Sequence, residues 1–269
     1  MNPNDMAPVP RPARLRRAPL WAALLGLLGV AQTLLVVLTL NYESGRAQDE
    51  ADTAAAQTAA EVRRELLLQM QALQALAFAD APTLAWREGA TTLLKQRRGL
   101  ERVERRQANL SVEDAVDTPF APSLVSQMPR RDLGVEAEVT CIAARRVGAP
   151  MFSRSYFVPL ASGLGAEVMD LCLPLLQAGQ DTGYLVASFS LPRVLDTVLT
   201  ARDSHRHEYS FVEGDGTRLA RAGVPRGAGV FVAERVVDLP GTTLQLRADG
   251  AAGRPSLIPN LVTALVLGL

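Results

Sequence analysis

The stretch that decides the fold is GAEVMDLCLPLLQAGQDTGYLVASFSLPRVL, residues 165–195. It holds two β-rich runs, Ala166–Leu173 and Gly183–Phe189, with turn residues between them, and the pattern predicts two strands. Pro192 then predicts a helix that runs to about Thr200, because proline in the first turn of a helix costs no hydrogen bond. Strands followed by a helix indicate a fold that combines both kinds of element.

Two more strands are predicted upstream, at Leu100–Arg106 and Phe152–Pro159. The segment that joins them is expected to be a loop that contains a helix at Leu133–Arg146. The loop is marked by four prolines: Pro119, Pro122, Pro129 and Pro150. One face of the helix carries three apolar residues: Val135, Val139 and Ile142.

Four short strands are predicted downstream: Glu208–Glu213, Thr217–Arg221, Gly229–Asp238 and Thr242–Ala248. Asp215-Gly216 and Pro240-Gly241 are expected to close two tight hairpins, since glycine tolerates the positive φ angle that such turns need. The strands are expected to form a small antiparallel meander, although they could instead complete one larger sheet. The predicted fold class is α+β, with a mixed sheet and a second, smaller antiparallel sheet.

A long helix is predicted at Arg46–Ala81, because this segment contains no glycine or proline and is rich in good helix formers. Apolar residues recur along it at spacings of three and four: Ala59, Val62, Leu66, Met70, Leu73 and Ala77. Such a stripe is either a core face or a dimer seam, and the alanine-rich first half suits close contact between two helices. A second helix is expected at about Thr83–Arg97, and Gly99 is expected to stop it from continuing.

Residues 18–40, APLWAALLGLLGVAQTLLVVLTL, contain no charge and exceed the roughly 20 residues that cross a hydrocarbon core as a helix. A signal peptide is the alternative, but the apolar run is long for one and shows no small-residue cleavage site at its end. Basic residues precede the span and keep that flank in the cytoplasm: Arg11, Arg14, Arg16 and Arg17. We therefore expect an uncleaved anchor, with residues 42–256 outside the cytoplasm.

The last residues, LIPNLVTALVLGL at 257–269, are again uncharged but too few to cross a bilayer. They are expected to begin a second span, or else to pack on the domain as a short apolar tail. The expected parts are a cytoplasmic segment at 1–17, a transmembrane helix at 18–41, a long helix with an α/β unit at 42–190, a small membrane-proximal unit at 191–256 and a truncated second span at 257–269.

Composition and charge exclude several classes of function. The 269 residues carry 28 Lys+Arg and 28 Asp+Glu, so the charge gives no reason to expect a nucleic-acid partner. A hydrophobic fraction of 48% excludes a disordered chain. No phosphate loop or catalytic triad pattern is supported, and His205 and His207 in one loop make a poor metal clamp. No catalytic or metal-binding residue is therefore predicted.

Six stretches carry a resemblance to a known family: LLKQRRGLERVERR at 93–106, SRSYFVPL at 153–160, GAEVMDLCLPL at 165–175, GYLVASFSLPRVL at 183–195, EGDGTRLA at 213–220 and DLPGTTLQLRAD at 238–249. With the apolar span before them, they resemble the sensor half of a bacterial two-component histidine kinase, most nearly the C4-dicarboxylate-sensing type with its PAS-like or Cache domain. The likeness covers most of residues 45–250. The chain departs from the family in having no phospho-acceptor histidine followed by a kinase domain, so ATP and magnesium would belong only to a domain that follows.

The resemblance implies a sensor in the bacterial inner membrane, with residues 42–256 in the periplasm. It would bind a small organic acid and relay the signal through the membrane helices of a homodimer. The unit up to about Phe189 would bind the ligand, and the unit after Pro192 would relay. A response regulator would be a partner only through a cytoplasmic part. The alternatives are the input domain of a chemoreceptor or of a cyclic-dinucleotide enzyme, and a membrane-tethered domain that binds a partner protein.

Arginines are the main ligand-binding candidates, because a guanidinium supplies the bidentate geometry that recognises carboxylates. Arg102 lies on the first predicted strand, and Arg145 and Arg146 end the helix before the second. Arg154 and Tyr156 are expected to share one face of that second strand by its period of two, and they are the preferred pair. The alternative is that these arginines are solvated or paired with neighbouring glutamates.

Asp170 is a further ligand candidate, and on its predicted strand it shares a face with Val168 and Cys172. An unpaired carboxylate on an apolar face is costly, so either an arginine of a neighbouring strand or a ligand amine is expected beside it. An unpaired Asp170 in the pocket would favour a cationic or amino-acid ligand over a dicarboxylate.

Cys141 and Cys172 are both expected outside the membrane, where an oxidising compartment permits a disulfide between them. Two buried free thiols are the alternative, because spacing in the sequence does not show whether the two Cα atoms approach closely enough.

Overall fold

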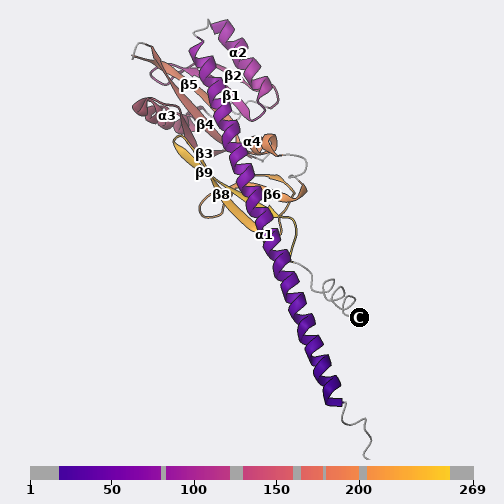
Figure 1. The fold of residues 1–269 in the computed structure, drawn as a ribbon. Helices are drawn as coiled ribbons and strands as arrows, with labels where there is room; N and C mark the ends of the chain where they lie inside the picture. Colours follow the sequence, from indigo (N-terminus) through magenta and orange to yellow (C-terminus); the bar gives the residue numbers. More distant parts are fainter. Residues whose placement is uncertain are drawn as a thin grey trace, which may run out of the picture. The chain divides into compact units, whose positions relative to one another are not determined.

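The computed structural model describes residues 18–79, 83–121, 130–159, 165–177, 180–199 and 205–254. The predicted cytoplasmic segment 1–17 and the predicted second span 257–269 lie outside these residues, as do Pro122 and Pro129 of the predicted loop. The chain divides into two units, one of Met1–Arg46 with Arg254–Leu269 and one of Ala47–Gly253. The unit Ala47–Gly253 contains both sheets (Figure 1).

Helix α1 (Ala18–Phe78) contains the predicted span and most of the predicted long helix. Its apolar residues in the unit that ends at Arg46 are largely exposed to solvent, as with Leu20 and Trp21. In the described part of the chain, α1 is the one helix that is long and apolar enough to cross a membrane, judged by length and composition.

Within the unit Ala47–Gly253, the predicted apolar stripe of α1 is a core face. Val62, Leu66 and Leu73 are fully buried among residues of both sheets. Ala51 and Ala55, in the alanine-rich half, pack against aromatic residues of the same chain, including Tyr209 and Phe231. The expected contact of these alanines with a second helix is therefore wrong, because the second sheet already covers them.

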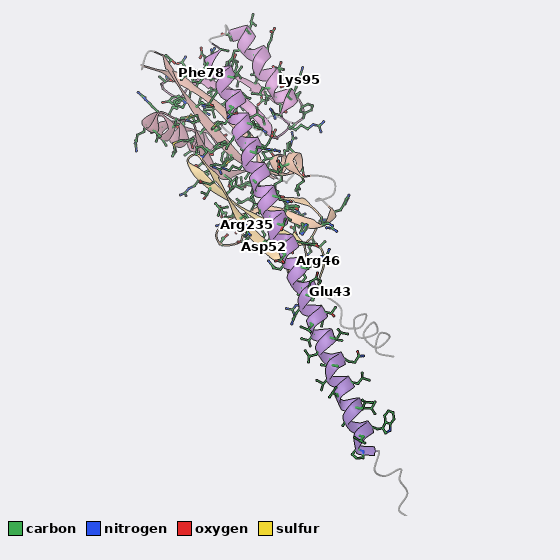
Figure 2. The ribbon with its side chains drawn as sticks, viewed as in Figure 1. Glu43, Arg46, Asp52, Phe78, Lys95 and Arg235 are labelled. Carbon is green, nitrogen blue, oxygen red and sulfur yellow. A yellow bond between two sulfur atoms is a disulfide. The ribbon has the colours of Figure 1, made fainter. Side chains whose placement is uncertain are left out.

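A charged contact adds to this packing where α1 passes strand β8 (Val232–Leu239). Arg235 forms an ion pair with Asp52 at 2.9 Å, and the two side chains lie together in Figure 2. Gln48 also donates a hydrogen bond of 2.9 Å to the backbone carbonyl of Val232.

The first sheet has five strands in the order β2-β1-β5-β4-β3. Their bounds are β1 (Leu100–Arg106), β2 (Val112–Asp117), β3 (Met151–Pro159), β4 (Gly165–Gln177) and β5 (Gln180–Ser190). All pairings between the described strands are antiparallel, so the expectation of a mixed sheet is wrong. Strand β2 was not predicted, because it lies at the sheet edge with three acidic residues among its six.

The second sheet has four strands in the order β7-β6-β9-β8. Besides β8 they are β6 (His207–Val212), β7 (Arg218–Gly223) and β9 (Thr242–Gly250). Both predicted hairpins form, with positive φ angles at Gly216 and Gly241. Strand β9 returns beside β6, so the sheet is antiparallel but is not the expected simple meander.

Three shorter helices complete the fold, α2 (Thr83–Gln96), α3 (Arg130–Val147) and α4 (Leu191–Val198). Helices α1, α2 and α4 bury residues in one large apolar core with Leu171, Leu185 and other residues of the first sheet. Helix α3 packs on β3 and β4 and shares a smaller cluster with Cys172, Tyr184 and Val186. Successive residues of a strand point to opposite faces, so α3 covers the face that α1 does not.

A disulfide joins α3 to the first sheet. Cys141 of α3 and Cys172 of β4 are bonded, with their Cα atoms 5.2 Å apart. The alternative of two free thiols is therefore wrong. Ala137 and Ala144 of α3 pack beside the disulfide in the same buried cluster.

Replacing Leu66 by alanine should lower the free energy of unfolding by about 2 to 5 kcal/mol, because a fully buried side chain leaves a cavity. Leu68 is 43% exposed on the same helix, and Leu68→Ala should cost less than about 1 kcal/mol. Urea unfolding of the full chain in detergent micelles, followed by circular dichroism, measures both. Equal losses in the two variants would contradict the placement of the core face.

Replacing both cysteines by alanine should lower the free energy of unfolding by about 4 kcal/mol, because Cys141 and Cys172 are 31 residues apart and their bond restricts the unfolded chain. The same urea titration tests this, with reduced wild-type protein as the control. Unchanged stability in both samples would show that the bond does not hold α3.

Candidate functional site

Buried polar residues line the face of the first sheet that α3 covers. On β1, Arg102, Glu104 and Arg106 alternate along this face and are all buried. Glu104 accepts hydrogen bonds from the Nε of Arg102 at 2.6 Å and from the Nε of Arg106 at 2.8 Å. Arg102 also donates to Asp117 of β2 at 2.7 Å. The predicted ligand residue Arg102 is therefore paired with carboxylates of its own chain.

A β-bulge separates the pair that was expected to act together on β3. Phe152 pairs with Leu171 and Ser155 pairs with Met169, so three steps on β3 match two steps on β4. Arg154 consequently lines an open groove together with Ser155, whereas Tyr156 faces Asp170. The prediction that Arg154 and Tyr156 share one face is wrong, because a bulge breaks the period of two.

Asp170 lies at the centre of a hydrogen-bonded group on the α3 side. Tyr156 donates its hydroxyl to Asp170 Oδ2 at 2.9 Å, and Ser188 of β5 donates to Asp170 Oδ1 at 2.6 Å. The backbone N–H of Asp170 donates to Ser153 Oγ at 2.8 Å. Among the residues that the structure describes, no arginine forms an ion pair with Asp170. The expected arginine partner is absent there, and neutral hydroxyls take its place.

Burial raises the pKa of Asp170 to about 6, more than its hydrogen bonds from Ser188 and Tyr156 lower it. The charge of Glu104 raises the pKa of Asp170 further, and Arg106 lowers it. Burial and the neighbouring Asp170 also raise the pKa of the Tyr156 hydroxyl, so that hydroxyl remains a donor. Asp170 is thus largely ionised at neutral pH and lacks a full countercharge.

Strand register places a row of polar residues across this face. Asp170 pairs with Ser188, Ser188 pairs with Arg102, and Arg102 pairs with Asp117. Neighbouring strands lie about 4.8 Å apart, so Asp170 and the guanidinium-bearing Arg102 are two strands, or about 10 Å, apart at the backbone. Within this row Arg102 already donates to Glu104 and Asp117, whereas Asp170 receives the hydroxyls of Tyr156 and Ser188.

The other predicted arginines do not join this row. Arg145 and Arg146 lie exposed in the last turn of α3.

Sequence reasoning missed Ser153 and Ser188. Ser188 could have been found only through the register that places it beside Asp170, because serine on a strand carries no signal of its own.

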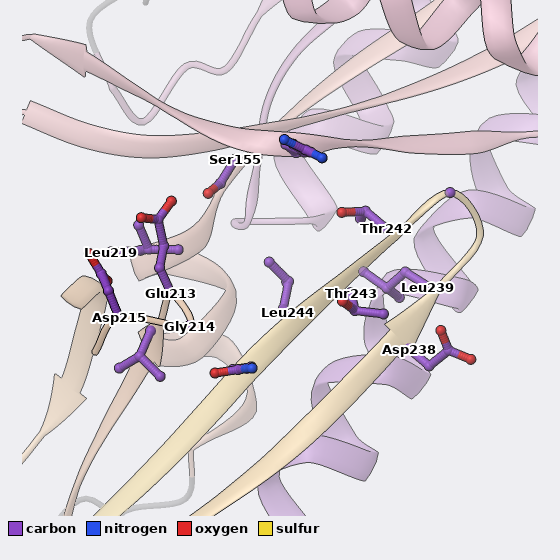
Figure 3. Close-up of a pocket in the computed structure, with 14 residues that line it drawn as sticks. Ser155, Glu213, Gly214, Asp215, Leu219, Asp238, Leu239, Thr242, Thr243 and Leu244 are labelled. Carbon is purple, nitrogen blue, oxygen red and sulfur yellow. The ribbon is translucent and has the colours of Figure 1, made fainter. Parts of the chain in front are cut away.

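The open groove beside Arg154 has a volume of about 860 Å³. It lies between β3 and the two hairpins of the second sheet, with Ser155 on one side and Thr242 on the other (Figure 3). Glu213 and Asp238 are exposed along it. Within the described ranges, no three His, Cys, Asp or Glu side chains are placed to hold a metal ion.

No protein-family model matches the sequence, and no curated protein matches it. Among solved structures, the ligand-binding domain of the Pseudomonas aeruginosa PAO1 amino-acid chemoreceptor PctC, in complex with GABA, is 18% identical with a TM-score of 0.46. That match covers 72% of this chain and 95% of that one.

The ligand-binding domain of the Pseudomonas fluorescens chemoreceptor CtaA, in complex with L-leucine, is 16% identical with a TM-score of 0.47, over 78% of this chain and 97% of that one. An extracellular ligand-binding receptor from Desulfohalobium retbaense is 14% identical with a TM-score of 0.49, over 72% of this chain and 39% of that one. Similarity at this level concerns the fold, and it assigns no ligand to this chain.

The raised pKa of Asp170 predicts a loss of stability with rising pH. The folded protein holds the Asp170 proton up to about pH 6, whereas the unfolded chain loses it near its ordinary value of 3.8. Titration of Asp170 should therefore lower the free energy of unfolding by about 3 kcal/mol between about pH 4 and about pH 6. Above about pH 6 this group should cause no further change.

Asp170→Asn should remove that part of the slope, because the amide does not titrate. Denaturant unfolding of the full chain across this pH range measures it, and Asp238→Asn, at an exposed position, is the matched control. The same slope in Asp170→Asn as in the wild type would contradict the assignment.

Proposed function

We propose that the chain is the extracytoplasmic input region of a membrane-anchored sensor, and that its ligand is a small solute with an ammonium group that binds at Asp170. The observation that carries the proposal is a fully buried carboxylate that neutral hydroxyls hold in place. A ligand ammonium would supply the missing countercharge and form a charge-assisted hydrogen bond.

The class of ligand follows from the charges around the site. A dicarboxylate would bring negative charge against Asp170 and Glu104, which are both buried on this face. An ammonium would instead be attracted to these carboxylates, and Arg102 already donates to Glu104 and Asp117. The proposal therefore makes the amine of the ligand its anchor.

The relay to the membrane is proposed to run through α1. Its apolar stripe packs against both sheets, and the same helix includes the segment apolar enough to span a membrane. A ligand can shift such a sensor only by binding its two signalling states with different affinity. By the sequence resemblance, the output is a histidine kinase of the inner membrane with the unit Ala47–Gly253 in the periplasm, and a chemoreceptor is the alternative.

A thermal-shift screen of the full chain in detergent micelles tests the ligand class. L-Leucine, L-arginine, GABA and ethylamine are the amine probes, and succinate and L-malate are the dicarboxylates. A ligand at about 100 times its dissociation constant should add about 2.7 kcal/mol to the free energy of unfolding. We expect stabilisation by at least one amine probe, its loss in Asp170→Asn and its retention in Asp238→Asn.

Two outcomes would overturn the proposal. Stabilisation by succinate alone, retained in Asp170→Asn, would restore the dicarboxylate hypothesis. A folded chain that no probe stabilises, over a broad panel of amines and amino acids, would favour a domain that binds a partner protein.

A further inference from the structure

The turn between β8 and β9 joins the second sheet to the first. The backbone N–H of Phe152, near the start of β3, donates a hydrogen bond of 2.7 Å to the carbonyl of Pro240 in this turn. Within the ranges that the structure describes, this is the one backbone hydrogen bond that links the two sheets. The tip of the β8–β9 hairpin therefore lies directly against β3 (Figure 3).

The turn approaches β3 so closely that a side chain at Gly241 would not fit. A Cβ atom at Gly241 would lie 2.9 Å from the carbonyl oxygen of Phe152 and 3.0 Å from Cε of Met151. Gly241 also has a φ angle of +92°, which residues with side chains rarely adopt. Gly216, in the other hairpin of the second sheet, has a φ angle of +85°, but a Cβ atom there would meet nothing within 4 Å. The two turns share a strained conformation, and the contact with β3 distinguishes them.

The contact is made at the residue before the β-bulge of β3. Phe152 is the last paired residue before the bulge, and pairing resumes at Ser155. Ser153 bridges the gap, because its Oγ accepts the N–H of Asp170 at 2.8 Å and donates to the carbonyl of Arg154 at 2.6 Å. The turn and the Ser153 hydroxyl thus hold the bulge from two sides.

The bulge decides which face of the sheet Tyr156 occupies. With the bulge, Tyr156 pairs with Val168 and donates its hydroxyl to Asp170. Without the bulge, the residues after Phe152 would move by one position, and Tyr156 would pair with Glu167. A shift of one residue sends each side chain to the opposite face of the sheet, so Tyr156 would no longer reach Asp170.

We infer that the Pro240–Gly241 turn of the second sheet is a positioning element for the Asp170 site. In the sheet order that the structure describes, β3 lies at an edge, so no neighbouring strand holds its register on the open side. The turn supplies that hold at Phe152, and the bulge then keeps Tyr156 on Asp170. This role serves the ligand site of the proposed function, on which it rests, but the placement of Tyr156 can be measured without a ligand.

The pH dependence of stability reports whether Tyr156 is in place. Its hydroxyl lowers the pKa of Asp170 by donating to the ionised carboxylate, so loss of this hydrogen bond should raise that pKa above about 6. The fall in the free energy of unfolding that begins near pH 4 should then continue to about pH 7. Glu104 and Arg106 of β1 also act on Asp170, and the α3 residues in the buried cluster on this face carry no charge.

Four variants test the positioning role by urea unfolding of the full chain in detergent micelles, between about pH 4 and about pH 8. Gly241→Val should extend the pH range of the fall by about one pH unit, because its side chain pushes the turn away from β3. Gly216→Val is the matched control and should leave the range unchanged. Ser153→Ala is a smaller change that removes the bridge in the bulge, and it should act as Gly241→Val does. Tyr156→Phe removes the hydroxyl itself and gives the reference shift.

A general loss of stability would not imitate this result. It would lower the free energy of unfolding by the same amount at every pH and would leave the pH range of the fall unchanged.

Ligand affinity gives a second measurement, by isothermal titration calorimetry with the amine probe that stabilises the protein most. Gly241→Val should weaken binding about fivefold or more, and Gly216→Val less than about twofold. If no probe binds the wild type, the proposed function fails, whereas the pH range still decides the positioning role.

Three results would overturn the inference. Gly241→Val and Ser153→Ala could keep the wild-type pH range while Tyr156→Phe extends it, which would show that the turn does not hold the bulge. Gly216→Val could extend the range as far as Gly241→Val, which would assign the effect to backbone strain alone. An unchanged range in Tyr156→Phe would show that its hydroxyl does not act on Asp170.

Discussion

The packing of one side of α1 against both sheets is the interaction on which the rest of the structure depends. Residues from Ala51 to Leu73 contribute the buried stripe, and the two sheets contribute the apolar side chains that cover it. Most of the stability of a helix in a folded protein comes from the packing of its apolar face, so these tertiary contacts stabilise α1 within the unit Ala47–Gly253. The same helix contains the segment that is long and apolar enough to cross a membrane.

The two faces of the first sheet differ in polarity. The face towards α1 is apolar and supplies the stability, which leaves the other face free to carry charges. On that other face the buried ladder of Arg102, Glu104 and Arg106 satisfies its own charges, whereas Asp170 receives only hydroxyl groups. An ion that is buried without a countercharge costs free energy, and function is the usual reason that such a site persists. The disulfide joins α3 to this face within a small apolar cluster.

Sequence periodicity predicted most of the elements because nearly every strand has one buried face, and the α+β class with two sheets is confirmed. It failed at β2, whose acidic residues lie on a sheet edge. It also failed at the bulge in β3, where one additional residue sent Arg154 and Tyr156 to different sites. Asp170 was found from the cost of its burial, but its partners Ser153 and Ser188 depend on strand register, which residue spacing within one strand does not contain.

Proton release on ligand binding tests the role of Asp170 most directly. The measurement is isothermal titration calorimetry of the full chain, in buffers of different ionisation enthalpy, with the amine probe that stabilises the protein most. Asp170, with its pKa of about 6, is half protonated at that pH, and an ammonium bound beside it would expel that proton. Binding should therefore release about half a proton at about pH 6 and almost none at about pH 8. Binding that takes up protons at about pH 6, or exchanges none, would contradict the account.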